Sequence, residues 1–252
     1  MTRFLLKLRG QSMLSNVLKL FVADVKRLKK YNILQISLGL TLLYGVLIYF
    51  TSAEEAQTLV SLLVFVDVSM MSIIMLGAGL FFEKQEGSLK SVMVSPVKLS
   101  EIVIAKTMSA VLLSFITATI LSAVAIIFHS ANINVLLLLL YATLGATVHI
   151  VIGFLLTIFS KDFNSLLVNY MIFVFIFTLP ALFYSLGVIP SNLYFLILLS
   201  PSYVTQVLIN TSINITPPLW EHLFAILYSV TIIAVLYKTV IYKKFKNYVI
   251  RG

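Results

Sequence analysis

The sequence predicts an all-α integral membrane protein with six transmembrane helices, and three observations carry that prediction. Hydrophobic residues make up 60% of the 252-residue chain and charged residues 11%, against roughly 45–50% and 25% in a soluble domain. Six stretches are almost continuously apolar over the ~20 residues that a helix needs to cross a hydrocarbon core of ~30 Å. Lysine and arginine are confined to the two ends of the chain and to every second connecting segment.

The apolar stretches divide the chain into three parts. Residues 1–32 are expected to form a cytoplasmic amphipathic segment, residues 33–241 the six-helix membrane domain, and residues 242–252 a basic cytoplasmic tail. A transmembrane β-barrel is excluded because the apolar stretches do not alternate with a period of two. The spans are predicted near residues 33–50, 58–82, 103–128, 135–159, 166–189 and 219–237.

The distribution of basic residues predicts the orientation. All 18 lysines and arginines lie before the first span, between spans two and three, between spans four and five, or at the C-terminal end. The connecting segments 51–57, 129–134 and 190–218 contain none. Because short cytoplasmic segments retain basic residues, both termini are expected in the cytoplasm, in a multi-pass protein of the cell membrane. Topology accounts for the net charge of +9, so no nucleic-acid partner is expected.

The segment before the first span has the pattern of an amphipathic helix. Six apolar residues recur at the spacing of one helix face, with basic residues on the other side. Such a helix lies in the membrane interface with its apolar face in lipid. It either only rests on anionic membrane lipid or also supports a cytoplasmic partner. The apolar residues are Leu14, Val17, Leu18, Phe21, Val25 and Leu28, and the basic ones are Lys19, Lys26, Arg27 and Lys30.

The connection between spans two and three predicts a short helix at the cytoplasmic surface. Gly87-Ser88 is typical of a break followed by a helix start, and Pro96 ends the helix. Between them, three apolar residues share one helix face: Leu89, Val92 and Met93.

Two ionisable residues lie deep within the spans, Asp67 in the second and His149 in the fourth. An acid at membrane depth costs ~2.5–3.5 kcal/mol on insertion scales, so each residue calls for an explanation. Asp67 is either a substrate contact or protonatable switch, or a carboxyl group that caps a helix or bonds a polar side chain across the bundle. His149 is either the partner of Asp67 or a side chain bonded to a backbone carbonyl.

The third span carries a stripe of small residues, which lets another helix approach closely. Packing within the chain and contact with a second copy are both consistent with it. The stripe consists of Ala110, Ser114, Ala118 and Ser122.

Prolines mark the outer side. Pro180 lies within the fifth span, where it is expected to bend the helix and to shape an outer gate. The uncharged segment 190–218 contains Pro190, Pro201, Pro217 and Pro218, and its apolar stretch is too short to span. It is therefore expected to form a re-entrant or interfacial hairpin.

Motifs for catalysis or metal binding are missing from the sequence. There is no cysteine, no phosphate-binding loop, no His-Glu-x-x-His and no Gly-x-Ser-x-Gly, and the three histidines are scattered. We therefore expect neither an enzyme nor a bound cofactor or metal in this chain.

The loop after the second span resembles the permease subunits of ABC-2 class exporters. In that class it reads Glu-x-x-x-Gly-Thr-Leu-Glu, a hydrophobic pair, a small residue and then proline, with an acid and a lysine downstream. This chain has Glu83, Gly87, Leu89 and Pro96 at these positions, with Glu101 and Lys106 downstream, whereas Ser88 replaces the threonine and Lys90 reverses the charge of the second glutamate. Ser200-Pro201-Ser202-Tyr203 before the last span adds to the likeness.

The stretch from Val64 to Asp67, leading into Gly77 to Glu83, is most similar to permeases described as fluoroquinolone or multidrug exporters. The resemblance implies an ABC-2 exporter-type permease fold in a bacterial plasma membrane. Two permease chains, either copies or homologues, would assemble with separate cytoplasmic ABC ATPase subunits that bind ATP and Mg²⁺. The implied activity is efflux of an amphipathic or hydrophobic substrate such as a drug, a lipid or a peptide-like molecule.

The resemblance also implies site residues. The ATPase would be coupled through Glu83, Glu86, Gly87, Ser88, Leu89, Lys90, Met93 and Pro96. Asp67 and His149 would lie on the substrate path, and Pro180, Pro201 and Tyr203 at the outer gate. The alternative is a proton-coupled secondary carrier or channel that uses Asp67 and His149. A membrane scaffold that only recruits a cytoplasmic protein is a third hypothesis, although it leaves Asp67 unexplained.

Overall fold

The computed structural model describes residues 13–250, and all regular structure in that range is helical. Long apolar helices packed side by side confirm the predicted all-α membrane class. Residues 1–12 and 251–252 lie outside the described residues, and with them four basic residues used in the topology prediction: Arg3, Lys7, Arg9 and Arg251.

In residues 13–250, five helices are long and apolar enough to cross a membrane, and the first predicted span is a sixth, shorter one. That helix, α3, has 17 residues, the lower end of the ~17–25 that span a bilayer. The helices at 53–85 and 219–250 extend beyond the predicted boundaries. The spans are α3 (Ile33–Tyr49), α4–η1–α5 (Ala53–Val66, Asp67–Met71, Ser72–Gln85), α7 (Leu99–His129), α8 (Val135–Phe159), α9–η2–α10 (Phe163–Phe173, Val174–Thr178, Leu179–Ser185) and α13–η4–α14 (Leu219–Leu236, Tyr237–Ile241, Tyr242–Ile250).

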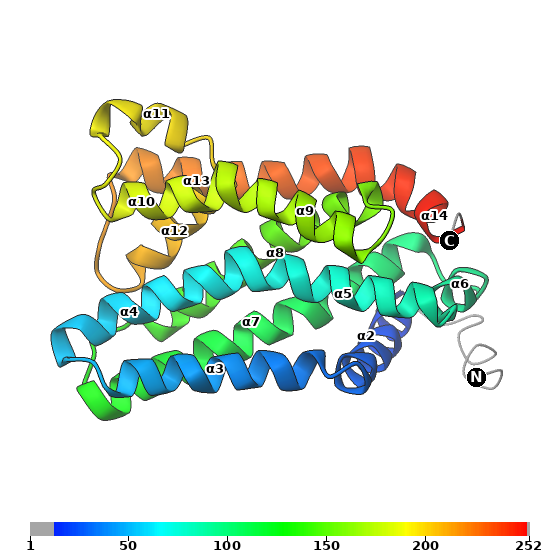
Figure 1. Ribbon diagram of the computed structural model, residues 1–252, viewed down its shortest axis with the longest axis horizontal. Coiled ribbons are helices and arrows are strands. Elements are labelled where there is room, and N and C mark those ends of the chain that lie inside the picture. Colours follow the sequence, from blue (N-terminus) through cyan, green and yellow to red (C-terminus); the bar gives the residue numbers. More distant parts are fainter. Residues whose placement is uncertain (1–12, 251–252) are drawn as a thin grey trace.

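The short elements gather at the two ends of the bundle (Figure 1). One end carries α2 (Met13–Lys30), α6 (Ser88–Met93) and α14, and we call it the basic end because these elements and the segments beside them hold the described lysines and arginines. The opposite end carries α10, η3 (Ser191–Leu193), α11 (Tyr194–Ile197) and α12 (Pro201–Thr211). The described chain starts and finishes at the same end, so it crosses the bundle an even number of times.

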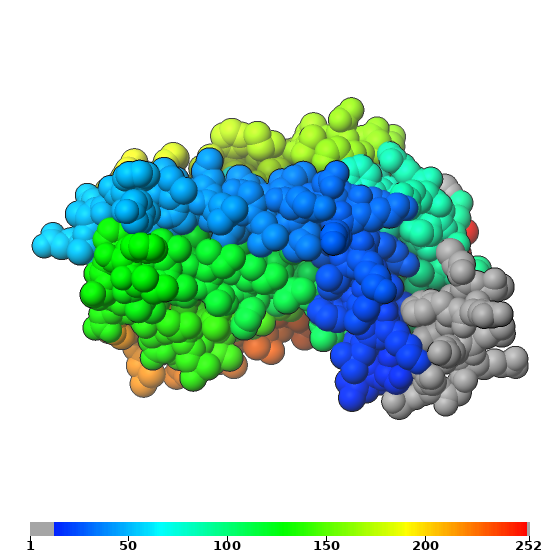
Figure 2. Space-filling model, turned by 90° about the horizontal axis from the view of Figure 1, so that it is seen from below, coloured from blue at the N-terminus to red at the C-terminus, as the bar shows by residue number. Residues whose placement is uncertain are grey.

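The amphipathic helix α2 lies across the basic end at 71° to α3, and it projects from the bundle in Figure 2. Asn32, which adopts a left-handed conformation with φ 61°, makes the turn between the two helices. Val17 and Leu20 are buried where α2 packs against α7 and α3. The predicted apolar face of this helix thus partly contacts protein.

The opposite end contains Pro180 and the predicted hairpin. Pro180 is the second residue after the π-helical turn η2, and the wider turn accommodates a residue that has no N–H to donate and whose ring crowds the carbonyl one turn back. Residues 191–197 and 201–211 form two short helices bent by 106°. The Ser200 hydroxyl caps the second by accepting from the N–H groups of Ser202 and Tyr203.

Small residues set the distance between helices. A Cβ atom at Gly153 of α8 would lie 3.3 Å from the Cα of Ile73 on α5, so glycine permits this close approach. The small-residue stripe of the third span is buried, on a helix that packs against α2, α3, α4 and α8. It serves packing within the chain.

Candidate functional site

Glycine separates the second span from the short helix α6. Gly87 has φ +69°, a left-handed conformation that a residue with a Cβ atom adopts only at a cost. Its N–H donates to the carbonyl of Lys84 at 3.1 Å, and the Ser88 hydroxyl donates to the carbonyl of Glu83 at 3.2 Å. The Ser88 hydroxyl thus ties the start of α6 to the end of α5.

The apolar face of α6 points into the protein. Leu89 is 0% exposed and Val92 6%, and Met93 packs against the same core. In residues 88–96, which comprise α6 and the three residues after it, the exposed side chains are Lys90, Val94 and Pro96, with Val94 84% exposed. Leu89 and Met93 therefore hold α6 in place from within, and a partner would contact the other side.

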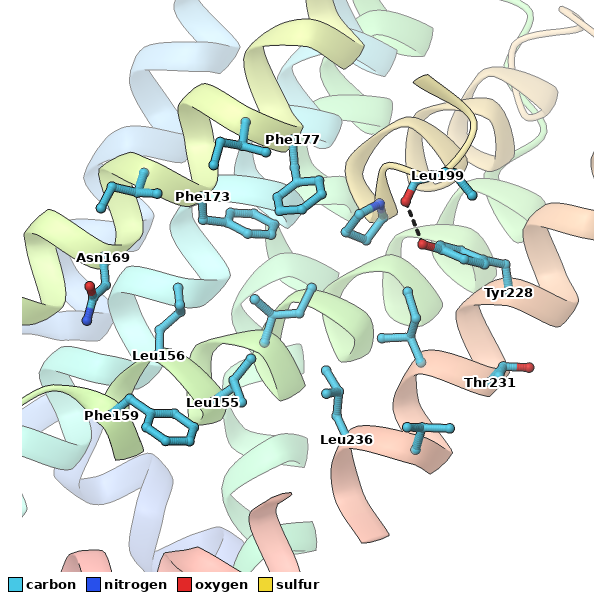
Figure 3. Close-up of a pocket in the computed structure, with 16 residues that line it drawn as sticks. Leu155, Leu156, Phe159, Asn169, Phe173, Phe177, Leu199, Tyr228, Thr231 and Leu236 are labelled. Carbon is cyan, nitrogen blue, oxygen red and sulfur yellow. Dashed lines mark hydrogen bonds between the residues drawn. The ribbon is translucent and has the colours of Figure 1, made fainter. Parts of the chain in front are cut away.

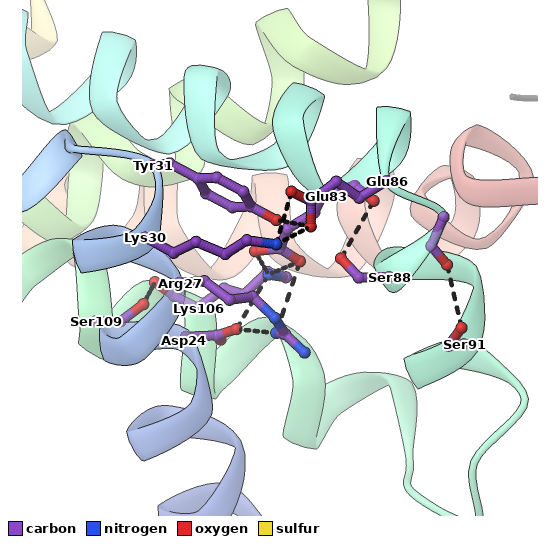
Figure 4. A network of polar contacts seen from close by, with 11 residues as sticks. Asp24, Arg27, Lys30, Tyr31, Glu83, Glu86, Ser88, Ser91, Lys106 and Ser109 are labelled. Atoms are coloured by element: carbon purple, nitrogen blue, oxygen red, sulfur yellow. Dashed lines mark hydrogen bonds and ion pairs between the residues drawn. The ribbon is translucent and has the colours of Figure 1, made fainter. Parts of the chain in front are cut away.

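A buried cluster of ion pairs lies behind α6 and joins α2 to the ends of α5 and α7 (Figure 4). The Lys106 ammonium donates to both carboxylate oxygens of Glu83 at 2.7 Å and to Asp24 at 3.4 Å. Arg27 pairs with Asp24 at 2.5 Å and lies 3.7 Å from Glu83. Two acids and two bases balance, so the cluster carries no net charge. Glu83, predicted to contact the ATPase, is a structural member of this cluster.

A second, exposed ion pair tethers the end of α5 to α2. Lys30 donates to Glu86 at 2.8 Å, and the Tyr31 hydroxyl donates to the same carboxylate at 2.8 Å. The hydrogen bond from Lys30 is the largest cause that lowers the pKa of Glu86 below its usual value, followed by the bond from Tyr31. Glu86 is thus held against α2.

Asp24 and α14 belong to this end of the molecule but were not among the predicted site residues. Asp24 is the single acid in residues 1–32 and lies on the apolar face of its helix, which is the signal that could have identified it. Residues 242–250, expected only as part of a basic tail, are the helix α14, in which Phe245, Tyr248 and Val249 are buried. Their i, i+3, i+4 spacing is the corresponding signal.

Asp67 lies inside the bundle, 4% exposed, at the start of the π-helical turn η1. The Thr117 hydroxyl of α7 lies 3.4 Å from its carboxyl group and 2.8 Å from the Thr41 hydroxyl of α3. The carboxyl group therefore faces two neighbouring helices rather than acyl chains.

His149 is fully buried near the middle of α8 and bonds to its own helix and to α12. Its Nδ1 lies 2.8 Å from the carbonyl oxygen of Gly145, and its Nε2 lies 3.2 Å from the hydroxyl of Ser202 on α12. The Ser202 hydroxyl lies 3.0 Å from that of Thr178. Within residues 13–250, the hydrogen bonds of Asp67 and those of His149 share no partner.

The predicted gate residues lie next to the hydrogen-bonded hydroxyl groups of Thr178 and Ser202 in the sequence, and Tyr203 also makes aromatic contacts. Pro201 is the first residue of α12, and Pro180 follows Thr178 by two residues. The Tyr203 hydroxyl donates to the buried carboxylate of Glu221 at 3.1 Å, and its ring meets that of Tyr184 edge-on with centroids 5.4 Å apart. Spans four, five and six are thereby joined through α12.

A cavity of about 660 Å³ opens between α8, α9, η2 and α13 (Figure 3). Its lining is apolar apart from Asn169, Tyr228 and Thr231, and it includes no Asp, Glu, Lys, Arg or His. In the described part of the chain, no group of three or more potential metal ligands occurs.

The comparisons with known proteins agree with this architecture. The sequence model of the ABC-2 type transporter family matches residues 12–212, which is most of the chain. Among curated proteins, none matches the chain.

Proposed function

The chain belongs to the ABC-2 type transporter family and is a permease subunit of an ABC exporter; we propose that ATP hydrolysed by a separate partner subunit drives it to move an amphipathic or hydrophobic substrate out of the cell. The basic end would face the cytoplasm, as the retention of lysine and arginine in short cytoplasmic segments implies. The membrane would be the plasma membrane of a bacterium.

The observation that carries this proposal is how α6 is packed against the rest of the chain. The helix is anchored by Leu89 and Val92 from inside and lies next to the ion pairs that join α2, α5 and α7. Its Lys90 and Val94 stay exposed at the basic end. A force applied to that surface would reach three helices at once, which is what an external motor requires.

The surface of α6 also indicates the partner's chemistry. Lys90, Met93 and Val94 line a cavity of about 510 Å³ together with residues of α14, among them Lys246. The cavity combines an apolar floor with two ammonium groups, so the facing ATPase surface would present apolar side chains and an acid. This matches the charge reversal at Lys90.

The uncharged cavity between spans four, five and six supports the proposed substrate class. Burying apolar surface is favourable by ~25 cal/mol per Å², whereas an ion there would find no counter-charge. A drug-like, lipid or peptide-like molecule with a large apolar part fits such a lining. A second permease chain, either a copy or a homologue, would complete the transporter.

A proton-coupled carrier is less well supported. Such a carrier would use a relay of ionisable groups, and Asp67 and His149 bond to different partners. We expect Asp67→Asn, which keeps the size of the side chain and removes its proton, to leave ATP-driven transport intact.

The test is substrate uptake into inverted vesicles that contain this chain and the ATPase encoded by the neighbouring reading frame. We expect uptake that needs ATP, persists with an uncoupler, and disappears when the catalytic carboxylate of the ATPase is neutralised. Uptake that needs the proton gradient and ignores ATP would overturn the proposal.

A further inference from the structure

A second cavity, of about 520 Å³, lies at the basic end between the last turn of α5, the α8–α9 connection and α14. Three lysines, one from each of these elements, line it. Its lining consists of Lys84, Lys161 and Lys244 with Ile158, Phe159, Ser160, Asn247 and Tyr248. We call it the lysine pocket.

The lysine pocket concentrates positive charge without an acid to balance it. None of the three lysines forms an ion pair with a described residue. The Lys84 ammonium lies 4.4 Å from the centre of the Tyr248 ring, and that of Lys244 lies 4.4 Å from the centre of the Phe159 ring. These cation–π contacts position the two groups but leave their charge uncompensated.

The acids next to these lysines in the sequence form their hydrogen bonds elsewhere, although Asp162 also attracts Lys161. Asp162 follows Lys161, but its carboxylate accepts the N–H of Ser165 at 2.7 Å and caps α9. That backbone hydrogen bond is the largest cause that lowers the pKa of Asp162. Glu83, beside Lys84, is bound to Lys106. The pocket is therefore complementary to an anion with several acceptor oxygens, as phosphate has.

The lysine pocket meets the apolar cavity of Figure 3. Phe159 lines both, and the amide of Asn169, in the apolar cavity, donates to the hydroxyl of Ser160, in the lysine pocket, at 3.0 Å. In Figure 3, Phe159 and Asn169 lie at one end of the apolar cavity, and Leu199 and Tyr228 at the other.

The few polar groups of the apolar cavity are already bonded. Asn169 donates to Ser160, Tyr228 donates to the carbonyl of Leu199 at 2.5 Å, and Thr231 donates to that of Leu227 at 2.7 Å. The cavity thus offers an occupant only apolar contacts, over a volume within the ~300–1,000 Å³ usual for ligand sites.

We propose that the two cavities form one site that binds an anionic phospholipid from the leaflet at the basic end. The phosphate lies among Lys84, Lys161 and Lys244, and an acyl chain lies along the apolar cavity past Phe159. A free phosphate ion would use only the first part, and an uncharged lipid only the second. The apolar cavity is the one that supports the proposed substrate class, but lipid binding to this chain needs no ATPase, so its test does not depend on the proposed energy source.

The first arm of the test compares headgroups with identical chains. The full-length chain in detergent is titrated with dioleoylphosphatidylglycerol or dioleoylphosphatidylcholine, and bound lipid is counted by native mass spectrometry. We expect the anionic lipid to bind at least about tenfold more tightly, since each nearby lysine contributes ~1 kcal/mol. Equal affinities, or displacement of the lipid by millimolar inorganic phosphate, would overturn the proposal.

The second arm replaces Lys84, Lys161 and Lys244 together by glutamine. The matched control replaces Lys26, Lys29 and Lys243, which are exposed outside the pocket, so that both variants lose the same charge. We expect about a hundredfold weaker binding of the anionic lipid in the first variant and less than about a threefold change in the control. Equal losses in both would contradict a built site.

The third arm fills the apolar cavity and decides the matter if the lysine variant fails to fold. Val235→Trp places a large ring in the cavity. The control Val46→Trp places the same ring at a comparably exposed position of α3 that does not line the cavity. We expect about a tenfold weaker binding of dioleoylphosphatidylglycerol for Val235→Trp only. Unchanged binding in Val235→Trp would show that no chain occupies the cavity.

Discussion

The two ends of the bundle are held together by different chemistry. At the basic end, Asp24, Glu83 and Lys106 are buried and compensate one another across three helices. Around α12, which belongs to the opposite end, hydroxyl and imidazole groups such as those of Thr178, Ser202 and His149 join the helices, and Glu221 is bonded to a tyrosine.

The two kinds of contact differ in how much free energy is needed to separate them. Separating buried ion pairs leaves uncompensated charges, at ~3–5 kcal/mol for one missing partner. A neutral hydrogen bond contributes only ~0.5–1.5 kcal/mol. We therefore expect α2, α5, α6 and α7 to move as one body, and the segment around α12 to separate more easily.

The largest expected effect is at the buried cation. Lys106→Met leaves Glu83 and Asp24 with only Arg27 and should lower the free energy of unfolding by ~3–5 kcal/mol. Lys29→Met, at an exposed position of α2, should change it by less than about 0.5 kcal/mol. Denaturant titration in detergent measures both. Similar values for the two variants would show that the cluster does not hold this end together.

A somewhat smaller loss of stability is expected at α6. Two substitutions there separate the packing of α6 against this chain from its contact with the ATPase. Leu89→Ala removes a fully buried side chain and should cost ~2–5 kcal/mol of stability. Val94→Asp alters an exposed side chain and should leave stability within about 0.5 kcal/mol, yet it should reduce permease-stimulated ATP turnover. The same turnover in Val94→Asp and the unmodified complex would remove Val94 from the contact.

The opposite end should respond less. Ser202→Ala deprives the buried His149 Nε2 and the Thr178 hydroxyl of their shared partner and should cost ~1–3 kcal/mol. Ser191→Ala, at an exposed position, is the matched control. A loss as large as that of Lys106→Met would erase the contrast between the two ends.

The smallest effect concerns pH at the exposed pair of Lys30 and Glu86. The pKa of Glu86 is lower in the folded chain than in the unfolded one, so its contribution is present above the unfolded pKa of ~4.3 and is lost as the pH falls through the folded pKa. Glu86→Gln should flatten this part of the pH dependence of the melting temperature between about pH 5 and pH 3. An unchanged profile would show that the pair contributes nothing.

The sequence predicted the spans and both amphipathic helices because apolar runs and helical periodicity are local signals. It did not predict what covers an apolar face. Leu89 and Val92 contact this chain's own core. Their apolar spacing alone does not distinguish such a contact from contact with a partner.

The ion pairs could not be predicted for a different reason. Lys106 lies 82 residues from Asp24 and 23 from Glu83 along the chain, and no local pattern sets such distances. The lysine residues of 242–250 likewise obscured the weaker apolar spacing of Phe245, Tyr248 and Val249, which places α14 at the lysine pocket.

The most direct test of the account is photo-crosslinking of the assembled complex with its candidate ATPase. A photoreactive amino acid is placed at Val94 on the basic end or at Val188 on the opposite end, both valines that are largely exposed. If the ATPase is coupled through α6, we expect a crosslink to the ATPase from position 94 and none from position 188. A crosslink from position 188, or its absence at position 94 in an assembled complex, would contradict coupling through α6.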